Sequence, residues 1–284
     1  MSGPPPLDLA VRDQPVPALP AATILLLRPP AEPSDELEIF CVQRRSSMRF
    51  LGGAVVFPGG KVDARDRVAA AAAKGTIARA ELLADDAIEA TAIAIAALRE
   101  TFEEAGVLAS PNADTEVSVR LRAAITAENP FDAELARTGL KLDLGRLVPF
   151  ARWITPEAEA RRYDTRFFLL ECPASQVAHA DERESSLGFW ATPSAALERF
   201  AKGEIQLAPP TTRCFELLVG VGSIAAAVEL ARAQSLLPIC PQFVPGDPPA
   251  LALPGDPAHG VREPRVAGKT RFVLRDGRFV SEDP

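Results

Sequence analysis

Hydrophobic residues recur at helical spacing across residues 86–105 of the chain. In an α-helix, which turns by about 100° per residue, one stripe of this segment carries Ile88, Ile95, Leu98 and Phe102. Asp86, followed three residues later by Glu89, has the pattern of an N-terminal cap, and Gly106 supplies the left-handed residue at which helices commonly end. The pattern therefore predicts one long helix over residues 86–105.

Segments rich in Ile, Leu, Val and Phe predict β-strands on both sides of this helix. We expect strands at residues 21–28, 37–44, 55–57, 147–154, 166–171 and 187–190. We expect a loop and a short helix within residues 109–130, and further helices at residues 192–202, 212–219 and 223–235. This mixture of elements indicates an α/β sandwich built on a mixed sheet.

The C-terminal part of the chain has a different composition. Residues 238–266 are rich in proline and glycine and predict an extended tail that packs over the domain. Within residues 271–280, Asp276-Gly277 favours a tight turn and so predicts a closing hairpin. We therefore expect a flexible N-terminal segment at residues 1–19, a main domain at 20–237 and the tail at 238–284.

Composition and charge exclude several classes of partner. The chain has 284 residues, of which 47% are hydrophobic, and a formal net charge of −7. This acidic balance argues against nucleic acid or an anionic membrane as the main partner.

The four cysteines have no paired spacing, so neither a zinc site nor a disulfide framework is indicated. The first 20 residues lack a long hydrophobic run, and we expect a cytoplasmic protein.

Three glutamates, Glu100, Glu103 and Glu104, fall on one side of the predicted helix, roughly opposite its hydrophobic stripe. Like charges at this spacing repel one another by roughly a few tenths of a kcal/mol per exposed pair, so their clustering gives no structural benefit. A divalent cation reverses that effect, and hard carboxylate oxygens suit Mg²⁺ or Mn²⁺. The simpler alternative is a solvated helix face, because exposed glutamates are common.

The glutamates belong to a longer pattern that begins at Gly60. After a long interval, Gly60 is followed by Arg99-Glu100-Thr101-Phe102-Glu103-Glu104-Ala105-Gly106-Val107. This arrangement resembles the box of the Nudix hydrolases, which runs Gly, five residues, Glu, seven residues, Arg-Glu-hydrophobic-x-Glu-Glu-x-Gly-hydrophobic. The resemblance implies a Nudix-type α/β/α sandwich and metal-dependent hydrolysis of a diphosphate bond.

The same resemblance suggests a role for each residue of the box. It implies that Glu100, Glu103 and Glu104 are the catalytic carboxylates and hold the metal, with Glu100 and Glu104 the more direct ligands. Glycine lets the backbone approach a ligand closely, so the Gly60 carbonyl can join the metal shell. Arg99 can hold a neighbouring carboxylate in position by a charge-assisted hydrogen bond. Which carboxylate takes a proton from water is left open.

The chain departs from the box at three points. Asp66 stands where the first Glu is expected, and Thr101 takes the place of a hydrophobic residue. Residues 67–98 separate Asp66 from Arg99, where the family pattern has seven residues. The first part of this insertion, residues 67–85, is rich in alanine and predicts a helical excursion that returns to start the long helix. The two halves of the site would then lie side by side.

One Nudix subgroup, the peroxisomal-type coenzyme A diphosphatases, carries an insertion at this same place, and the chain resembles that subgroup. Elements resembling that subgroup occur at residues 42–60, 152–156 and 161–168, at Leu207-Ala208-Pro209-Pro210-Thr211, and at residues 253–257. In the first of these elements, Arg45 stands where Ser is expected. Arginine forks bind phosphate at two points, so the substrate-binding candidates are Arg44, Arg45, Arg49, Arg161 and Arg162. Ordinary surface ion pairs are the alternative.

We therefore expect a small nucleotide substrate, namely coenzyme A or acyl-coenzyme A, cleaved into adenosine 3′,5′-bisphosphate and (acyl-)phosphopantetheine. Two alternatives stay open: a pyrophosphatase for another nucleoside diphosphate derivative, such as ADP-ribose or a dinucleotide, and a non-catalytic Nudix module that senses a nucleotide. Glu184, in a charged loop, is a candidate additional acid, although a solvated turn explains the same residues. Trp153 and Trp190 are assigned mainly to the core.

Overall fold

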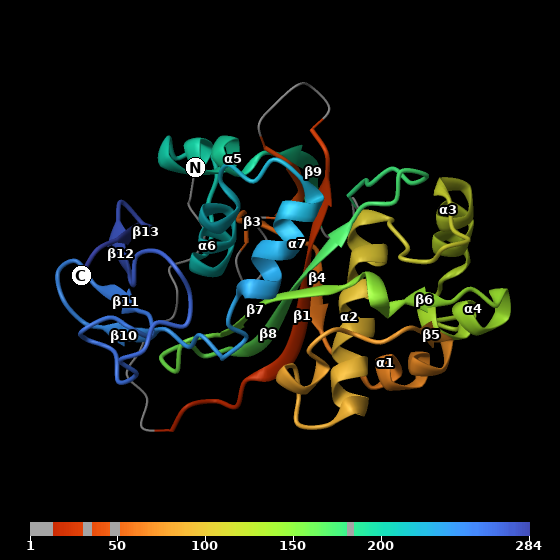
Figure 1. Cartoon of the computed structure of the whole chain (residues 1–284), viewed down its shortest axis with the longest axis horizontal. Coiled ribbons are helices and arrows are strands. Elements are labelled where there is room, and N and C mark those ends of the chain that lie inside the picture. Colours follow the sequence, from red (N-terminus) through yellow and green to blue (C-terminus); the bar gives the residue numbers. More distant parts are fainter. Residues whose placement is uncertain (1–13, 31–35, 46–51, 181–184) are drawn as a thin grey trace.

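The computed structural model describes residues 14–30, 36–45, 52–180 and 185–284 (Figure 1). Its main sheet has seven strands, with β1 (Leu19–Arg28) near the middle. β8 (Tyr163–Glu171) pairs with β1 in parallel, and the other pairings are antiparallel. The remaining strands are β2 (Glu38–Arg44), β3 (Val55–Val56), β4 (Gly59–Lys61), β7 (Val148–Ile154) and β9 (Ser185–Ala191). The prediction of a mixed sheet is confirmed.

Helices cover both faces of the sheet (Figure 1). Because successive strand residues point to opposite faces, Leu26 of β1 joins one hydrophobic core and Leu27 joins the other. The first face is covered by α1 (Ala64–Ala69), α2 (Ala87–Ala105), α3 (Thr115–Ala124) and α4 (Phe131–Thr138). The second is covered by α5 (Pro193–Ala201), α6 (Pro209–Leu218) and α7 (Ile224–Ala233). The predicted α/β/α sandwich is therefore confirmed.

Helix α2 begins and ends where the sequence predicts. The Asp86 carboxylate accepts a hydrogen bond of 2.8 Å from the Glu89 N–H, and Gly106 ends the helix with φ of 70°. The predicted hydrophobic stripe is wrong at Ile88, which is 69% exposed. Residues 92–97 are instead fully buried around the whole helix, because the sheet lies on one side and α1 with the insertion on the other.

The insertion, residues 67–85, is only partly the helical excursion that its composition predicts. After α1 it forms two 3₁₀ turns, Ala70–Ala72 and Ala80–Leu82. Between them, β5 (Ala73–Lys74) pairs in parallel with β6 (Leu142–Asp143), a strand that precedes a further 3₁₀ turn at Leu144–Arg146. Arg166 of β8 donates a hydrogen bond of 2.9 Å to the Leu83 carbonyl and so ties the insertion to the main sheet.

Two other short elements differ from the prediction. The sequence Phe57-Pro58-Gly59-Gly60 predicts a strand that ends in a turn, but Gly59-Gly60 begins strand β4 and pairs with β1. Helix α4 was not predicted, since it follows the single short helix expected within residues 109–130. Elements this short contain too few residues for their periodicity to be recognised.

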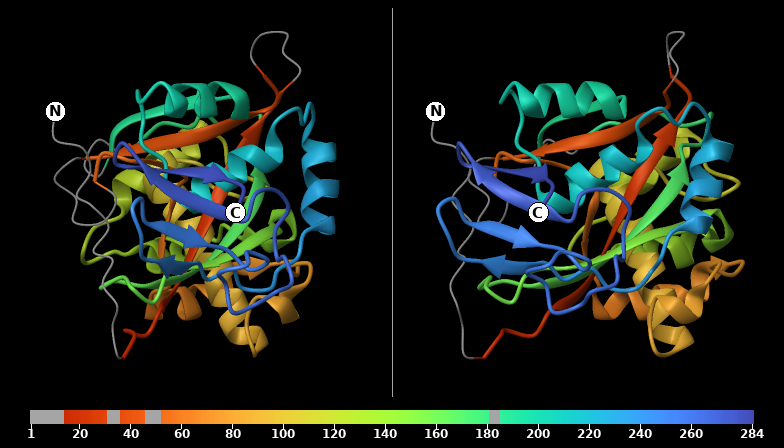
Figure 2. Two further views of the ribbon diagram at one scale, coloured as in Figure 1. Left: turned by 90° about the vertical axis from the view of Figure 1, so that its left-hand side faces the viewer. Right: turned by 60° about the vertical axis from the view of Figure 1, so that its left-hand side comes forward.

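The C-terminal residues form a second sheet, of four antiparallel strands, at one side of the molecule (Figure 2). Its strands are β10 (Gln242–Val244), β11 (Ala250–Ala252), β12 (Arg271–Arg275) and β13 (Arg278–Glu282). The predicted hairpin is confirmed, with positive φ at Asp276 and Gly277. Leu251 and Phe272 of this sheet join the hydrophobic core to which α6 also contributes. The proposed division of the chain at residue 238 remains a prediction.

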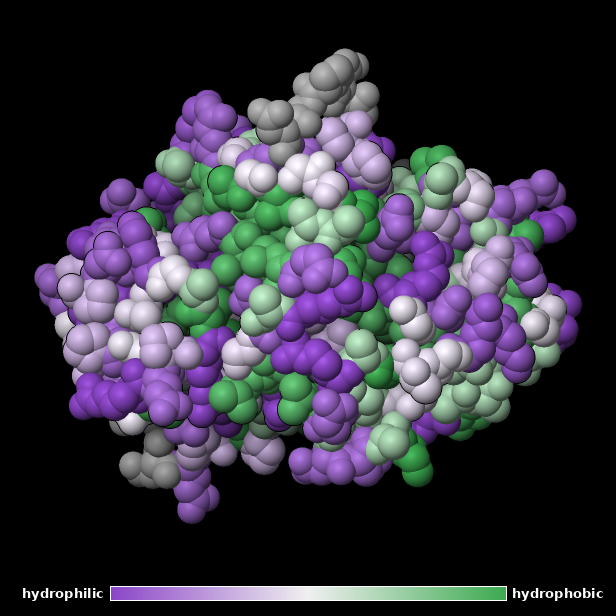
Figure 3. All heavy atoms as spheres, in the orientation of Figure 1, coloured by the Kyte–Doolittle hydropathy of each residue, from purple (hydrophilic) through white to green (hydrophobic). Residues whose placement is uncertain are grey.

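Polar and charged side chains cover most of the molecular face drawn in Figure 3, and hydrophobic side chains gather near its centre, around α6 and α7. Val219, which follows α6, and Leu237, which follows α7, are each about half exposed. Among the described residues, no helix combines the length and hydrophobicity needed to cross a bilayer.

Candidate active site

Strand β4 and helix α2 bring the two halves of the split pattern into contact. The Gly59 N–H donates a hydrogen bond of 3.0 Å to Oε2 of Glu104. At Gly60, an added Cβ atom would lie only 2.4 Å from the carboxyl carbon of Glu100. The backbone of the two glycines therefore lies directly against the carboxylate face of α2, and a side chain at position 60 would displace Glu100.

Arg99 holds the carboxylates of this site together. Its Nε and Nη2 atoms donate to the two oxygens of Asp66 at 2.7 and 3.1 Å. Its Nη1 atom donates to Glu100 at 2.8 Å and to Glu103 at 3.0 Å, and Nη2 also reaches the Lys61 carbonyl at 3.1 Å. Burial alone would lower the pKa of Arg99, but the hydrogen bonds to Asp66 and the surrounding carboxylates raise it above its ordinary value. The guanidinium thus offsets repulsion among the acids.

The structure explains two of the departures from the box. Asp66 is 1% exposed, and besides binding Arg99 it accepts a 2.7 Å hydrogen bond from the Asp63 N–H, which closes a capping box at the start of α1. The shorter acid therefore still reaches its arginine. Thr101 is fully buried, and its hydroxyl donates to the Ala97 carbonyl at 2.8 Å, so no polar group is left unpaired.

The oxygen atoms at this site are of the kind that suits a hard divalent cation. Gly60 and the three glutamates of α2 line one cavity, and carboxylate and carbonyl oxygens are the ligands that Mg²⁺ and Mn²⁺ prefer. In the part of the chain that the structure describes, no three Asp, Glu, His or Cys side chains form a ready-made metal shell. Two of the glutamates point instead to Arg99, at the distances given above. The donor set therefore fits a cation once these carboxylates turn into the cavity.

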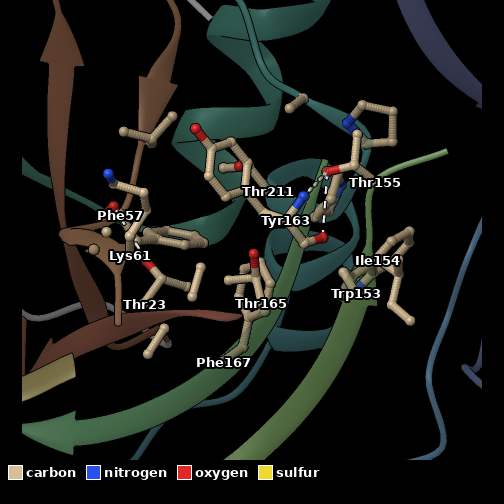
Figure 4. Close-up of a pocket in the computed structure, with 18 of the residues that line it drawn as sticks. Thr23, Phe57, Lys61, Trp153, Ile154, Thr155, Tyr163, Thr165, Phe167 and Thr211 are labelled. Atoms are coloured by element: carbon tan, nitrogen blue, oxygen red, sulfur yellow. Dashed lines mark hydrogen bonds between the residues drawn. The ribbon is translucent and has the colours of Figure 1, made fainter. Parts of the chain in front are cut away.

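The cavity has a volume of about 600 Å³ and lies between the main sheet, α2, α6 and the C-terminal sheet. Figure 4 draws 18 of the lining residues, with Lys61 and Phe57 on one side and Ile154 and Thr155 on the other. Its hydrophobic walls include Phe57, Trp153, Ile154, Phe167, Pro241 and Leu251. It therefore combines an acidic end with a large hydrophobic surface.

Of the four predicted arginines that the structure describes, two lie at this cavity. Arg44, at the end of β2, lines it, and its Nε atom is buried without a hydrogen-bond partner among the described residues. Arg161 lines the cavity from the loop between β7 and β8 and is exposed. Arg45 is exposed and is not part of the lining. Arg162 is also outside the lining and donates hydrogen bonds to the carbonyls of Thr155 and Val16. Arg162 thus has a structural role.

Two predicted site residues, Arg49 and Glu184, lie outside the residues that the structure describes. Glu159, which the sequence analysis did not single out, is 5% exposed and lines the cavity, so a second buried carboxylate group borders the site apart from the α2 cluster. It lies in a loop with no recognisable motif. The sequence therefore offered no signal by which to find it.

The sequence analysis assigned no role to Lys61 or Tyr163, both of which line the cavity, although Tyr163 belongs to the element at residues 161–168. Lys61 directly follows the glycine pair that opens the box, and this position was the available signal. Tyr163 is anchored by a 3.0 Å hydrogen bond from its N–H to the Thr155 hydroxyl, and Figure 4 shows its ring in the middle of the cavity. These residues add a cation and an aromatic surface to the site.

The two tryptophans differ in their surroundings. Trp190 packs edge-on against Phe40, with ring centroids 5.3 Å apart, and Arg28 lies 4.2 Å from the centre of its ring. Trp153 is 3% exposed and belongs to the core, as predicted, but it also forms part of the cavity wall. Its indole Nε1 has no hydrogen-bond partner among the described residues.

Comparisons with known proteins agree with this geometry. Residues 71–218 match the model of the NUDT19 Nudix domain family. The acyl-coenzyme A diphosphatase NUDT19 of Gallus gallus is 29% identical over 309 aligned residues, covering 89% of this chain and 80% of that protein. The human protein of the same name is 28% identical over 227 residues, covering 64% of this chain and 60% of its own length.

Among solved structures, a Nudix hydrolase from Alicyclobacillus acidocaldarius superposes with a TM-score of 0.62 and 31% identity. The match covers 75% of this chain and 96% of that one. Two findings lead to the same assignment. The family model spans more than half of the chain, and the solved structure is similar in both sequence and fold. The chain belongs to the NUDT19 Nudix domain family and is an enzyme of the Nudix hydrolase type.

Proposed function

We propose that the enzyme hydrolyses the diphosphate bond of coenzyme A or acyl-coenzyme A, giving adenosine 3′,5′-bisphosphate and (acyl-)phosphopantetheine. The observation that carries the proposal is the form of the cavity, in which the carboxylates of α2 share one space with Arg44 and a long hydrophobic wall. An acyl-coenzyme A needs all three, because it joins a diphosphate, a separate phosphate and a largely uncharged arm. The names of the vertebrate relatives agree with this substrate.

The proposed metal ligands are Glu100, Glu103 and Glu104, with the carbonyl of Gly60. When bound, Mg²⁺ or Mn²⁺ would neutralise diphosphate oxygens and lower the pKa of a coordinated water. The Gly59 N–H fixes Glu104, and Arg99 orients the other two glutamates. These residues thereby hold the acids at the positions that the diphosphate must approach.

The remaining side chains would bind and orient the substrate. Arg44 and Arg161 are proposed to contact its phosphate groups, since both line the cavity and neither has an ion-pair partner among the described residues. Trp153 and Leu251 would contact the pantetheine or acyl arm through hydrophobic surface. The roles suggested for Arg45, Arg49 and Glu184 remain predictions from the sequence.

A substrate panel tests the assignment. Purified enzyme is assayed with Mg²⁺, Mn²⁺ or a chelator against coenzyme A, acyl-coenzyme A species, ADP-ribose and a dinucleoside polyphosphate. We expect metal-dependent turnover with the highest kcat/KM for a coenzyme A species, and products that retain the 3′-phosphate on the adenosine. Equal or better turnover of ADP-ribose would contradict the coenzyme A assignment and favour the broader pyrophosphatase.

A Glu104→Gln variant tests the catalytic site itself. The amide oxygen still accepts the hydrogen bond from Gly59, so the fold persists, but a negative metal ligand is lost. We expect kcat to fall by at least about a hundredfold, as is typical when a main electrostatic contribution is removed. The matched control is Glu116→Gln on α3, whose side chain is 77% exposed and pairs with a neighbouring arginine on the surface. An active Glu104→Gln enzyme would rule out this metal site.

A further inference from the structure

We propose that the first turn of α6 binds a phosphate monoester of the substrate, with Thr211 as the residue that recognises it. This inference rests on the proposed function, because coenzyme A carries such a group, the 3′-phosphate, apart from its diphosphate. The segment Leu207-Ala208-Pro209-Pro210-Thr211 resembles an element of the coenzyme A diphosphatase subgroup, but its sequence alone assigns it no chemical role. The structure places this element in the wall of the cavity.

Thr211 is a buried polar residue without a partner. It is 5% exposed, lines the cavity and lies among the labelled side chains of Figure 4. Neither its hydroxyl nor its N–H makes a hydrogen bond with any residue that the structure describes. The hydroxyl is open to the cavity, where a ligand with oxygen acceptors can take hydrogen bonds from both groups.

The composition of this first turn leaves few backbone N–H groups available to a ligand. Pro209 and Pro210 have no N–H, and the Thr212 N–H already donates to the Ala208 carbonyl at 2.9 Å. No side chain caps the start of the helix. Thr211 therefore provides the N–H of this turn that remains for a ligand, at the positive end of the helix dipole, where anions bind favourably.

Arg44 supplies a full positive charge to the same cavity. The Arg44 N–H is hydrogen-bonded to the Ala54 carbonyl at 3.0 Å, and the Val55 N–H to the Gln206 carbonyl at 2.9 Å. A short series of backbone contacts thus joins the end of β2 to the residues that lead into α6. Arg44 and Thr211 both line this cavity, so the guanidinium and the donors of Thr211 together suit the oxygens of a phosphate.

This subsite is separate from the carboxylate cluster. Helix α2 packs on one face of the main sheet and α6 packs on the other, and the cavity is bordered by both. A ligand with two phosphate groups can therefore place its diphosphate at the glutamates and its monoester at Thr211. ADP-ribose has no monoester, so the subsite predicts selectivity for a 3′-phosphorylated nucleotide.

Binding measured without metal tests the subsite directly. Titration calorimetry in the presence of a chelator compares adenosine 3′,5′-bisphosphate with AMP, which lacks the 3′-phosphate. We expect the wild-type enzyme to prefer the bisphosphate, and Thr211→Val to reduce that preference by about tenfold, the lower end of what a hydrogen bond to a charged group contributes. Thr211→Ser, which keeps the hydroxyl, should restore the preference.

The matched control is Thr212→Val, the same change one residue further along α6. Thr212 is 2% exposed, its hydroxyl bonds to the Ala208 carbonyl, and it does not line the cavity. The control variant should keep the preference for the bisphosphate. An unchanged preference in Thr211→Val, or equal binding of both nucleotides by the wild type, would overturn the subsite.

Kinetics separate this inference from the proposed function. The ratio of kcat/KM for coenzyme A to that for dephospho-coenzyme A should fall about tenfold in Thr211→Val, chiefly through KM. Turnover of coenzyme A with a ratio unaffected by the substitution leaves the proposed function intact and removes the subsite. If coenzyme A is not hydrolysed, while binding of the bisphosphate still depends on Thr211, the proposed function fails and the subsite stands.

Discussion

At the scale of single residues, Gly60 is the position where one methyl group should harm the site most. Its added Cβ would meet the Glu100 carboxylate, which is the mobile end of a side chain but is held by Arg99. We therefore expect Gly60→Ala to fold with nearly the wild-type Tm and to lose about a hundredfold in kcat/KM, since small displacements of reacting groups have effects of this size. Assays at saturating metal, combined with thermal unfolding, measure both.

Gly260→Ala is the matched control for this substitution. Its added Cβ would be 3.7 Å from the nearest atom, an ordinary contact with the flexible Gln242 side chain. Its activity should remain at the wild-type level. A Gly60→Ala enzyme as active as this control would show that the close approach of β4 to α2 is unimportant for catalysis.

How much of the site the sequence could predict depends on where its residues come from. The two glycines and the glutamates follow a fixed pattern, and the structure indeed brings Gly60 and Glu100 together. Lys61 enters the cavity from β4, whereas Glu159 and Tyr163 enter it from the loop before β8 and the start of β8, and only folding brings these two segments together. Arg162 shows the converse, because an arginine suited to phosphate binds backbone carbonyls instead.

At the scale of elements, the buried carboxylate of Glu36 connects two helices. It accepts hydrogen bonds from the N–H and the hydroxyl of Ser194 in α5, at 3.0 and 2.6 Å, and from the Gly220 N–H after α6, at 2.8 Å. In Glu36→Gln an amide N–H₂ would face one of these donors. We expect a loss of about 1–3 kcal/mol in the free energy of unfolding, the usual cost of an unsatisfied buried group.

The effect of Glu36 should depend on pH in a defined direction. Burial raises the pKa of its carboxyl, but the hydrogen bonds from Ser194 and Gly220 outweigh burial and lower it below the ordinary value of 4.5. The stabilisation is therefore complete above that value and is lost as the pH falls through the lower pKa of the folded state. Urea unfolding of wild type and Glu36→Gln from pH 7 to pH 3 should show the difference shrinking at the acid end.

Glu229→Gln serves as the control for this series, since its side chain is 70% exposed on α7 and pairs with Arg232. It should change the free energy of unfolding by less than about 1 kcal/mol at any pH. A difference between wild type and Glu36→Gln that does not vary with pH would contradict the proposed role of the Glu36 charge.

Long elements were predictable, whereas short ones were not. Helix α2 has nineteen residues, a cap at Asp86 and a glycine stop, and these signals fixed both of its ends. Its buried face was predicted less well, because the helix is enclosed on nearly all sides and alanines replace the polar face of a surface helix. Strand β4 and helix α4 depend on pairing and packing with distant residues, which local pattern does not reveal.

At the scale of the whole molecule, Asp256 secures the C-terminal sheet. It is fully buried and forms two hydrogen bonds with Arg271, at 2.9 and 2.7 Å, and a third with the Ala258 N–H. In Asp256→Asn the partner arginine loses its counter-charge. We expect a loss of about 3 kcal/mol in unfolding free energy, the lower end for a broken buried pair, measurable by chemical denaturation.

Loss of this ion pair should also affect the cavity, because Pro241 and Leu251 of the C-terminal region form part of its wall. We expect a higher KM for acyl-coenzyme A together with faster proteolysis within residues 238–284. Asp283→Asn, at an exposed position near the C-terminus, should change neither property. Wild-type stability in Asp256→Asn would show that the sheet is held mainly by its hydrophobic contacts.

The architecture as a whole was accessible from the sequence, but the C-terminal sheet was not. Alternating hydrophobic strands and helices indicate a sandwich, and the hairpin at Asp276-Gly277 follows from its turn residues. Strands β10 and β11 have three residues each within a proline-rich region. Arg213, fully buried, binds the carbonyls of Ala267 and Lys269 and so fixes this region against α6. Composition gives no indication of such a long-range contact.

The ion pair between Asp66 and Arg99 affects how the sequence of this chain can change in evolution. The detour of residues 67–85 is closed at its base by that ion pair and by the start of α2. Closing a loop becomes only slightly harder as the loop grows, at roughly 0.6 kcal/mol for each doubling of its length. Additions to this segment should therefore accumulate among descendants without disturbing catalysis, and the spacing between the two fragments would drift while the fragments themselves persist.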